Sequence, residues 1–221
     1  MISSPQEERK AKTLQRALDE IADLDLEGQG RKGGFTCKAL ADGRQQISIP
    51  SFGDTLSIFF PQGDIEFPAF IDSFSLQVLA LRYIKLSCDK PITGEWIAYR
   101  DLPGGRFYAA TLVPTVEQPL AQAFGTSPGL LAKAAAGFGG LKVDYGDEAY
   151  VFYPFPRTPL LSVLHWGDEE FEPDCRILFD RCCSHYLNTD DLKILATQLS
   201  AYLLKWSGAQ VQIENLLWMV E

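Results

Sequence analysis

The stretch Ala149-Tyr150-Val151-Phe152-Tyr153 is followed by Leu160-Leu161-Ser162-Val163-Leu164-His165 and then by Arg176-Ile177-Leu178-Phe179. These three short runs are rich in β-branched, aromatic and aliphatic residues, the types that are enriched in strands. Proline-rich segments or a Gly-Asp turn separate them, as expected for consecutive antiparallel strands. They predict a sheet in the second half of the chain.

A second group of predicted strands lies nearer the N-terminus. Residues 35–40 and 46–49 flank Asp42-Gly43, a dipeptide typical of tight hairpin turns. Residues 55–60 form a third candidate strand, and Pro61-Gln62-Gly63-Asp64 supplies the next turn. The first half therefore contributes antiparallel strands as well.

Apolar residues spaced three and four positions apart predict helices at the start, middle and end of the chain. The first helix should cover residues 5–25, because Ser4-Pro5-Gln6-Glu7 has the form of a capping box. Gly28 and Gly30 are expected to end it. The other helices are predicted at residues 69–88, 116–124, 129–136 and 192–206.

The strands come in clusters rather than alternating with helices, which favours the α+β class. We therefore predict a mainly antiparallel sheet with the N-terminal, central and C-terminal helices packed on it. No linker-like segment divides the 221 residues. Residues 1–221 are expected to form a single domain.

Charge and composition exclude some classes of protein. The net charge is −9 and basic runs are short, so no nucleic-acid partner is expected. No stretch reaches the roughly 18 apolar residues of a membrane span, and the N-terminus lacks the apolar core of a signal peptide. Five cysteines in a mid-sized acidic chain suggest reduced thiols and a cytoplasmic location.

Six short motifs occur in a characteristic order. They are Thr93-Gly94-Glu95-Trp96, Leu102-Pro103-Gly104-Gly105, Asp144-Tyr145-Gly146-Asp147, Phe155-Pro156-Arg157, Gly167-Asp168-Glu169-Glu170-Phe171 and Leu178-Phe179-Asp180. In this order and spacing the chain resembles the uncharacterised prokaryotic family known as domain of unknown function 3786. The resemblance covers residues 14–204, which leaves residues 207–221 as a C-terminal extension.

Some relatives in that family are joined to a cysteine-rich iron–sulfur module, which implies an anaerobic redox or cofactor-handling setting. This chain has no run of closely spaced cysteines, so no cluster is carried over. The family has no established activity, and the resemblance therefore implies a fold without assigning catalytic residues.

The segment of residues 93–108 is the first candidate for a binding site. It mixes aromatic residues, arginines and glycines too irregularly for a long helix or strand, and such loops often carry function. The candidate ligand-binding residues are Trp96, Tyr99, Arg100, Arg106 and Tyr108. The two arginines would hold a carboxylate or phosphate, and aromatic rings would offer a flat stacking wall. The expected ligand is a small planar or anionic molecule.

The same segment also has a purely structural interpretation. Trp96 and Phe107 would then anchor the loop in the core. Arg100 would pair with Asp101 or Glu95. Both interpretations stay open at the level of sequence.

Three consecutive carboxylates follow one of the predicted strands. Asp168, Glu169 and Glu170 are candidate catalytic acids or bases, or ligands of a hard cation such as Mg²⁺ or Ca²⁺. The alternative is a solvated turn in which Asp168 bonds its own backbone.

Cysteine and histidine concentrate in one place, and Cys175, Cys183 and His185 are the candidate metal ligands there. Zinc sites typically separate their cysteines by about two to four residues, whereas Cys182 and Cys183 are adjacent. The poor spacing predicts no metal site. A buried, inert cysteine is one alternative, and a cysteine nucleophile with His185 or His165 as its base is another.

The sequence points to no reaction and to no cofactor. The favoured interpretation is a cytoplasmic binding or accessory module for a small molecule or a protein. The first alternative is an enzyme whose arginine-bearing loop holds an anionic substrate. The second is a homo-oligomeric assembly module, in which apolar residues of the segment 211–220 cover a partner.

Overall fold

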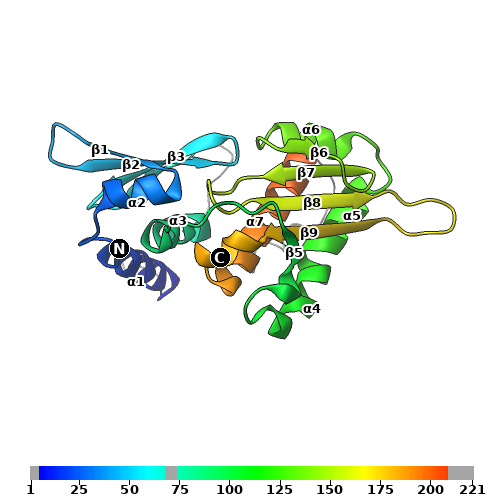
Figure 1. Ribbon diagram of the computed structural model, residues 1–221, viewed down its shortest axis with the longest axis horizontal. Coiled ribbons are helices and arrows are strands. Elements are labelled where there is room, and N and C mark those ends of the chain that lie inside the picture. The colour runs from blue at the N-terminus through cyan, green and yellow to red at the C-terminus, as the bar shows by residue number, and fades with distance from the viewer. Residues whose placement is uncertain (1–4, 68–73, 209–221) are drawn as a thin grey trace.

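The structure is a computed structural model that describes residues 5–67 and 74–208. Within these residues the chain forms two antiparallel sheets with helices packed around them (Figure 1). The predicted α+β class is confirmed. The strands are shared between a small and a large sheet, because the two clusters of strands in the sequence pair only within themselves.

The small sheet has the strand order β1-β2-β3-β4. Its strands are β1 (Thr36–Ala39), β2 (Gln45–Ser51), β3 (Asp54–Phe60) and β4 (Asp64–Glu66). The turn between β1 and β2 is at Asp42-Gly43 as predicted: Gly43 has a φ of 85°, and the Asp42 carboxylate accepts from the Arg44 N–H. One face of β2 and β3 is buried through Ile47, Ile49, Leu56 and Ile58.

The large sheet has the strand order β5-β9-β8-β7-β6. Its strands are β5 (Trp96–Ala98), β6 (Leu141–Val143), β7 (Glu148–Phe152), β8 (Leu160–His165) and β9 (Asp174–Asp180). Strand β7 is buried at every position and β8 at all but its last. This burial explains the nearly continuous apolar runs in the sequence, because neither face of these strands meets water.

The N-terminal helical region differs from the prediction of one helix over residues 5–25. It contains α1 (Pro5–Asp19) and a separate α2 (Leu26–Gly33). Asp25 caps α2, since its side chain accepts from the Gly28 N–H at 3.0 Å. Gly28 and Gly30 therefore lie inside a helix rather than ending one. Close packing requires Gly30, where a Cβ would lie 2.5 Å from the Phe35 carbonyl oxygen.

Four other helices fall near their predicted places: α3 (Phe74–Leu86), α5 (Gln118–Phe124), α6 (Leu130–Ala136) and α7 (Thr189–Ser207). The short helix α4 (Ala109–Leu112) was not predicted. A π-helical turn, Val113–Glu117, joins α4 to α5, so the helical region predicted at residues 116–124 begins several residues earlier. Helices α5 and α6 lie against the large sheet, and α7 packs on both of them.

One hydrophobic core connects the two sheets. Phe52, after β2, contacts Phe138 and Tyr202 with ring centroids 6.3 and 5.6 Å apart. Gly53 and Gly139 meet backbone to backbone at the same place. Figure 1 shows the two sheets at opposite ends of the molecule, with α3 and α7 in the region between them.

The apolar segment 211–220, proposed from the sequence as a cover for a partner, lies outside the described residues. A search of the described part of the chain finds no helix with the length and apolar character needed to cross a bilayer.

Candidate functional site

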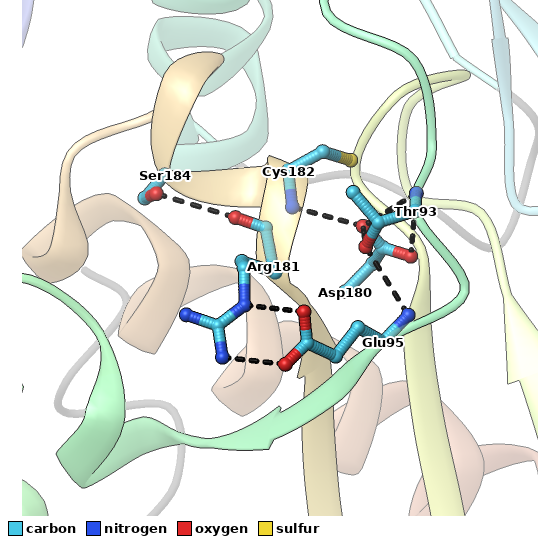
Figure 2. A network of polar contacts seen from close by, with 6 residues as sticks. All are labelled: Thr93, Glu95, Asp180, Arg181, Cys182 and Ser184. Atoms are coloured by element: carbon cyan, nitrogen blue, oxygen red, sulfur yellow. Dashed lines mark hydrogen bonds and ion pairs between the residues drawn. The ribbon is translucent and has the colours of Figure 1, made fainter.

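Asp180, at the end of β9, organises the start of the candidate loop (Figure 2). Its carboxylate is fully buried. It accepts hydrogen bonds from the N–H and hydroxyl groups of Thr93, the latter at 2.8 Å, and from the Gly94 N–H at 2.6 Å. The Cys182 N–H donates to it at 2.8 Å. Two of the sequence motifs are therefore joined through one carboxylate.

Burial alone would raise the pKa of Asp180, but the hydrogen bonds from Cys182 and Thr93 outweigh it and hold the pKa below its usual value. Next to it, Arg181 forms a two-pronged ion pair with Glu95, with both N···O distances at 2.6 Å. Both partners are exposed, so this pair contributes little to stability. Because the Asp180 carboxylate is buried and already hydrogen-bonded to the loop, we interpret it as a brace.

The candidate loop then divides into two parts. After β5 it makes two short 3₁₀ turns, Tyr99–Asp101 and Gly105–Phe107. Trp96 is half-buried against a small apolar cluster formed by residues of β7 and β8. Phe107 is 88% exposed, so it does not anchor the loop in the core, and Glu95 pairs with Arg181 rather than with Arg100.

A surface cavity of about 580 Å³ opens beside the first of these turns. Its lining comes from β5 and the following turn, from α4 and the π-helical turn, and from β9. The lining residues are Ala98, Tyr99, Arg100, Ala109, Ala110, Leu112, Val113, Glu117, Arg176 and Leu178. Tyr99 and Arg100 were predicted ligand-binding residues, whereas Trp96, Arg106 and Tyr108 do not line this cavity. Its walls are mostly apolar, and its charged groups are two arginines and one glutamate.

Glu117 and Arg176 meet within this cavity. The Arg176 Nη1 lies 3.4 Å from the Glu117 Oε2, and the Ile177 N–H donates to Glu117 Oε1 at 3.2 Å. Arg176 also donates through Nε to Asp174 at 2.9 Å. An arginine carries five N–H donors, so its remaining donors stay available to a ligand.

The Glu117 carboxyl is buried, and this burial raises its pKa. The Ile177 N–H and the Arg176 guanidinium act in the opposite direction but do not cancel the effect. Glu117 ends the π-helical turn, whose wider spacing is seen in the hydrogen bond from the Gln118 N–H to the Val113 carbonyl. Such turns are frequent at functional sites.

Arg100 also lines this cavity. Its guanidinium has no hydrogen bond or ion pair within residues 5–67 and 74–208, and its charge acts on Glu117. Arg100 and Arg176 are 76 positions apart in the numbering and come together because β5 pairs with β9, placing Ala98 opposite Leu178. The cavity thus combines an arginine without an acidic partner and a second arginine shared between two carboxylates.

A second cavity, of about 520 Å³, lies between α1, α3 and the start of α7. Its cations are already paired with carboxylates. Arg16 and Lys85 contact Glu20, and Arg82 forms an ion pair with the buried Asp191. Each of these cations already has an acidic partner. An incoming anion would therefore have to compete with a carboxylate for every cation in this cavity, which makes it a weaker candidate for anion binding than the cavity lined by Arg100.

The predicted acidic cluster lies in the loop between β8 and β9, at the outer tip of the large sheet (Figure 1). Asp168, Glu169 and Glu170 are all exposed. The Glu170 and Phe171 N–H groups each donate to Asp168 at 2.8 Å, which lowers the pKa of Asp168. Asp168 thus closes its own turn, and none of the three lines the arginine cavity.

The candidate metal ligands lie on two different elements. Cys183 and His185 belong to a 3₁₀ turn, Arg181–His185, while Cys175 lies in β9. Cys175 and Cys183 are buried and His185 is exposed. Burial raises the pKa of Cys175 to about 12, so this thiol stays protonated. Across the described residues, no three Cys, His, Asp or Glu side chains gather as a metal site would require.

Glu117 was not among the residues predicted for the site, and Arg176 was predicted only as part of a strand. One local signal was available for Glu117. Pro114 and Pro119 flank it and lack the N–H groups that a regular helix would use, so an irregular turn was to be expected. The approach of Arg176 depends on strand pairing, which no local pattern reveals.

The fold and the cavity define an α+β protein with an arginine-lined surface cavity. The sequence profile described as Domain of unknown function (DUF3786) matches residues 36–202, which is more than half of the chain. The chain belongs to this family, as the motifs predicted, and the match begins at residue 36. No curated protein and no solved structure matches the chain significantly.

Proposed function

We propose that this protein binds a small organic anion with an apolar body in the cavity between β5, α4 and β9. The observation that supports this most is the convergence of Arg100 and Arg176 on one cavity. A guanidinium binds a carboxylate through paired N–H donors. Arg100 is free of acidic partners in the described structure, so an incoming anion need not displace an ion pair there.

The walls of the cavity suggest what the rest of the ligand is like. Ala98, Ala109, Leu112, Val113 and Leu178 present methyl and aliphatic groups. Ligand sites commonly combine such apolar walls with a few well-placed polar groups. The volume of about 580 Å³ lies within the roughly 300–1,000 Å³ of typical small-molecule sites. A carboxylate attached to a small ring or a short chain suits this combination.

A thermal-denaturation series tests the proposal. Acetate, butyrate, benzoate and phosphate are added at constant ionic strength, and Tm is followed. Benzoate and butyrate should raise Tm in a saturable way, by roughly 5–10 °C at one hundred times Kd, because a ligand that binds only the folded state stabilises it. Acetate and phosphate should have smaller effects, since neither fills the apolar walls.

Three variants locate the effect. Arg100→Gln and Arg176→Gln should each weaken benzoate binding about tenfold or more, because each removes a charge-assisted contact. Arg106→Gln is the matched control, since Arg106 is an exposed arginine of the same loop that does not line the cavity. The proposal fails if no carboxylate raises Tm, or if Arg106→Gln weakens binding as much as the other two.

The proposed setting is the cytoplasm of a prokaryote. All five cysteines are free, which fits a reducing compartment. The anaerobic redox setting that the family resemblance implies stays part of this proposal. Purification of the protein from its native host, followed by mass spectrometry of small molecules released on denaturation, would identify the physiological anion.

A further inference from the structure

Charge balance in the arginine cavity suggests that more than an anion binds there. Arg100 and Arg176 contribute two positive charges, and Glu117 and Asp174 contribute two negative charges. With Glu117 ionised, these four groups sum to zero. With Glu117 protonated, the set carries one net positive charge, which a monoanion would neutralise.

The geometry places Glu117 in competition with an incoming anion. Its Oε2 is 3.4 Å from the Arg176 guanidinium, one of the two groups that the anion would contact. Two carboxylates sharing one cation in a partly enclosed site repel each other, and this favours protonation of the more buried one. Of the two protein carboxylates that contact Arg176, Glu117 is the more buried, since its side chain is 9% exposed and that of Asp174 is 51% exposed.

The charged groups around Glu117 are two arginines, which oppose its protonation, and one aspartate, which favours it. On β9 it faces Arg176, Asp174 and the thiol of Cys175, which stays neutral, and from the turn after β5 it faces Arg100. On the α7 side, the neighbouring polar contact is the uncharged hydroxyl of Ser200, which donates to the Val116 carbonyl. The Ile177 N–H can donate to the carbonyl oxygen of a protonated carboxyl as well as to a carboxylate.

We propose that the cavity binds a monoanion together with one proton, which is taken from solvent and held on the Glu117 carboxyl. This inference depends on the proposed function, because it concerns the same cavity. The protonated carboxyl would also gain an O–H donor for the bound anion. Burial, which already raises the pKa of Glu117 in the free protein, acts in the same direction.

Isothermal titration calorimetry with sodium benzoate provides the test. Titrations at pH 7.5 in Tris, triethanolamine and imidazole differ in buffer ionisation enthalpy, and none of these buffers is itself an anion. The slope of the observed enthalpy against ionisation enthalpy gives the protons taken up per benzoate. We expect uptake approaching about one proton, and an affinity that falls up to about tenfold per pH unit as the pH rises.

Variants assign the proton. Glu117→Gln mimics the neutral carboxyl, so it should bind benzoate with no proton uptake and with an affinity that no longer depends on pH. Glu148→Gln is the matched control, because Glu148 is also a buried glutamate but does not line the cavity. It should retain the wild-type uptake.

The outcomes separate the two proposals. Benzoate binding with no proton uptake in the wild type overturns this inference and leaves the proposed function standing, as does full uptake in Glu117→Gln. Absence of benzoate binding overturns the proposed function and this inference with it. The wild-type titrations need no variant, so poor folding of Glu117→Gln would not remove the test.

Discussion

Asp180 illustrates how one buried carboxylate can fix a loop. It is fully buried, and its oxygens accept from Thr93, Gly94 and Cys182. Buried charges persist when hydrogen bonds replace the lost water. Because Thr93 and Gly94 precede β5, this brace sets the path of the chain into the arginine cavity.

Replacing Asp180 by Ala should therefore destabilise the protein strongly. The N–H groups of Thr93, Gly94 and Cys182 would lose their acceptor, and we expect a loss of about 3 kcal/mol in the free energy of unfolding, measured by urea denaturation. Asp168→Ala is the control, since Asp168 accepts from two backbone N–H groups in an exposed turn. It should cost much less, and equal losses would contradict the brace.

The lowered pKa of Asp180 also predicts a pH dependence. Between this pKa and the unfolded value of about 3.9, the unfolded chain binds more protons than the folded one, so stability rises with pH. The stability advantage of the wild type over Asp180→Asn should be fully present above about pH 5. It should shrink as the pH falls through the folded pKa. An advantage that stays constant from neutral pH down to strongly acidic pH would show that the carboxylate charge has no role.

At the scale of elements, a pair of glycines joins the two sheets. A Cβ at Gly53 would lie 2.8 Å from the Gly139 Cα, and both residues have positive φ angles. Gly43, in the β1–β2 turn, has nearly the same φ as Gly53, 85° against 81°, but a Cβ added there would meet no atom within 4 Å. Both glycines therefore need a positive φ, but only Gly53 lacks space for a side chain.

This difference gives a direct prediction. Gly43→Ala should cost about 1–2 kcal/mol, the strain of a left-handed alanine. Gly53→Ala should cost about 1–3 kcal/mol more, because its methyl group must also push the two segments apart. Urea denaturation of the two variants measures the difference. Equal costs would mean that the approach of Gly53 to Gly139 is not a tight contact.

Elements with strong local signals were predictable. The Asp42-Gly43 turn and the apolar runs of β7 and β8 could be recognised locally, because turn chemistry and burial on both faces leave a pattern in the sequence. Gly28 and Gly30 misled the prediction of the first helix. A glycine that permits close packing, as at Gly30, resembles a glycine that ends a helix.

The candidate site was only partly predictable for a different reason. Tyr99 and Arg100 stood out through the composition of their loop. Arg176 joins them only through the pairing of β5 with β9, and Glu117 only through a π-helical turn. These are long-range and irregular features, which short sequence patterns do not encode.

For the whole molecule, we expect residues 5–208 to unfold as one unit. The hydrophobic core contains residues of both sheets, such as Ile47 and Leu164. Trp96 lies in β5, Trp166 directly follows β8, and Trp206 in α7 donates to the Lys133 carbonyl of α6. The fluorescence of these tryptophans reports mainly on the large-sheet side, while far-UV circular dichroism reports on both sheets. The two signals should give coincident urea transitions. A separate earlier transition seen only by circular dichroism would indicate two domains.

The proposed binding of an organic anion in the cavity between β5, α4 and β9 can be examined in a crystal structure of the protein with 4-bromobenzoate. The bromine atom can be located by anomalous scattering. We expect the carboxylate between Arg100 and Arg176, with the bromine against the apolar wall formed by Leu112 and Val113. An empty cavity at saturating ligand, or bromobenzoate bound instead beside Arg16 and Lys85, would contradict this proposal.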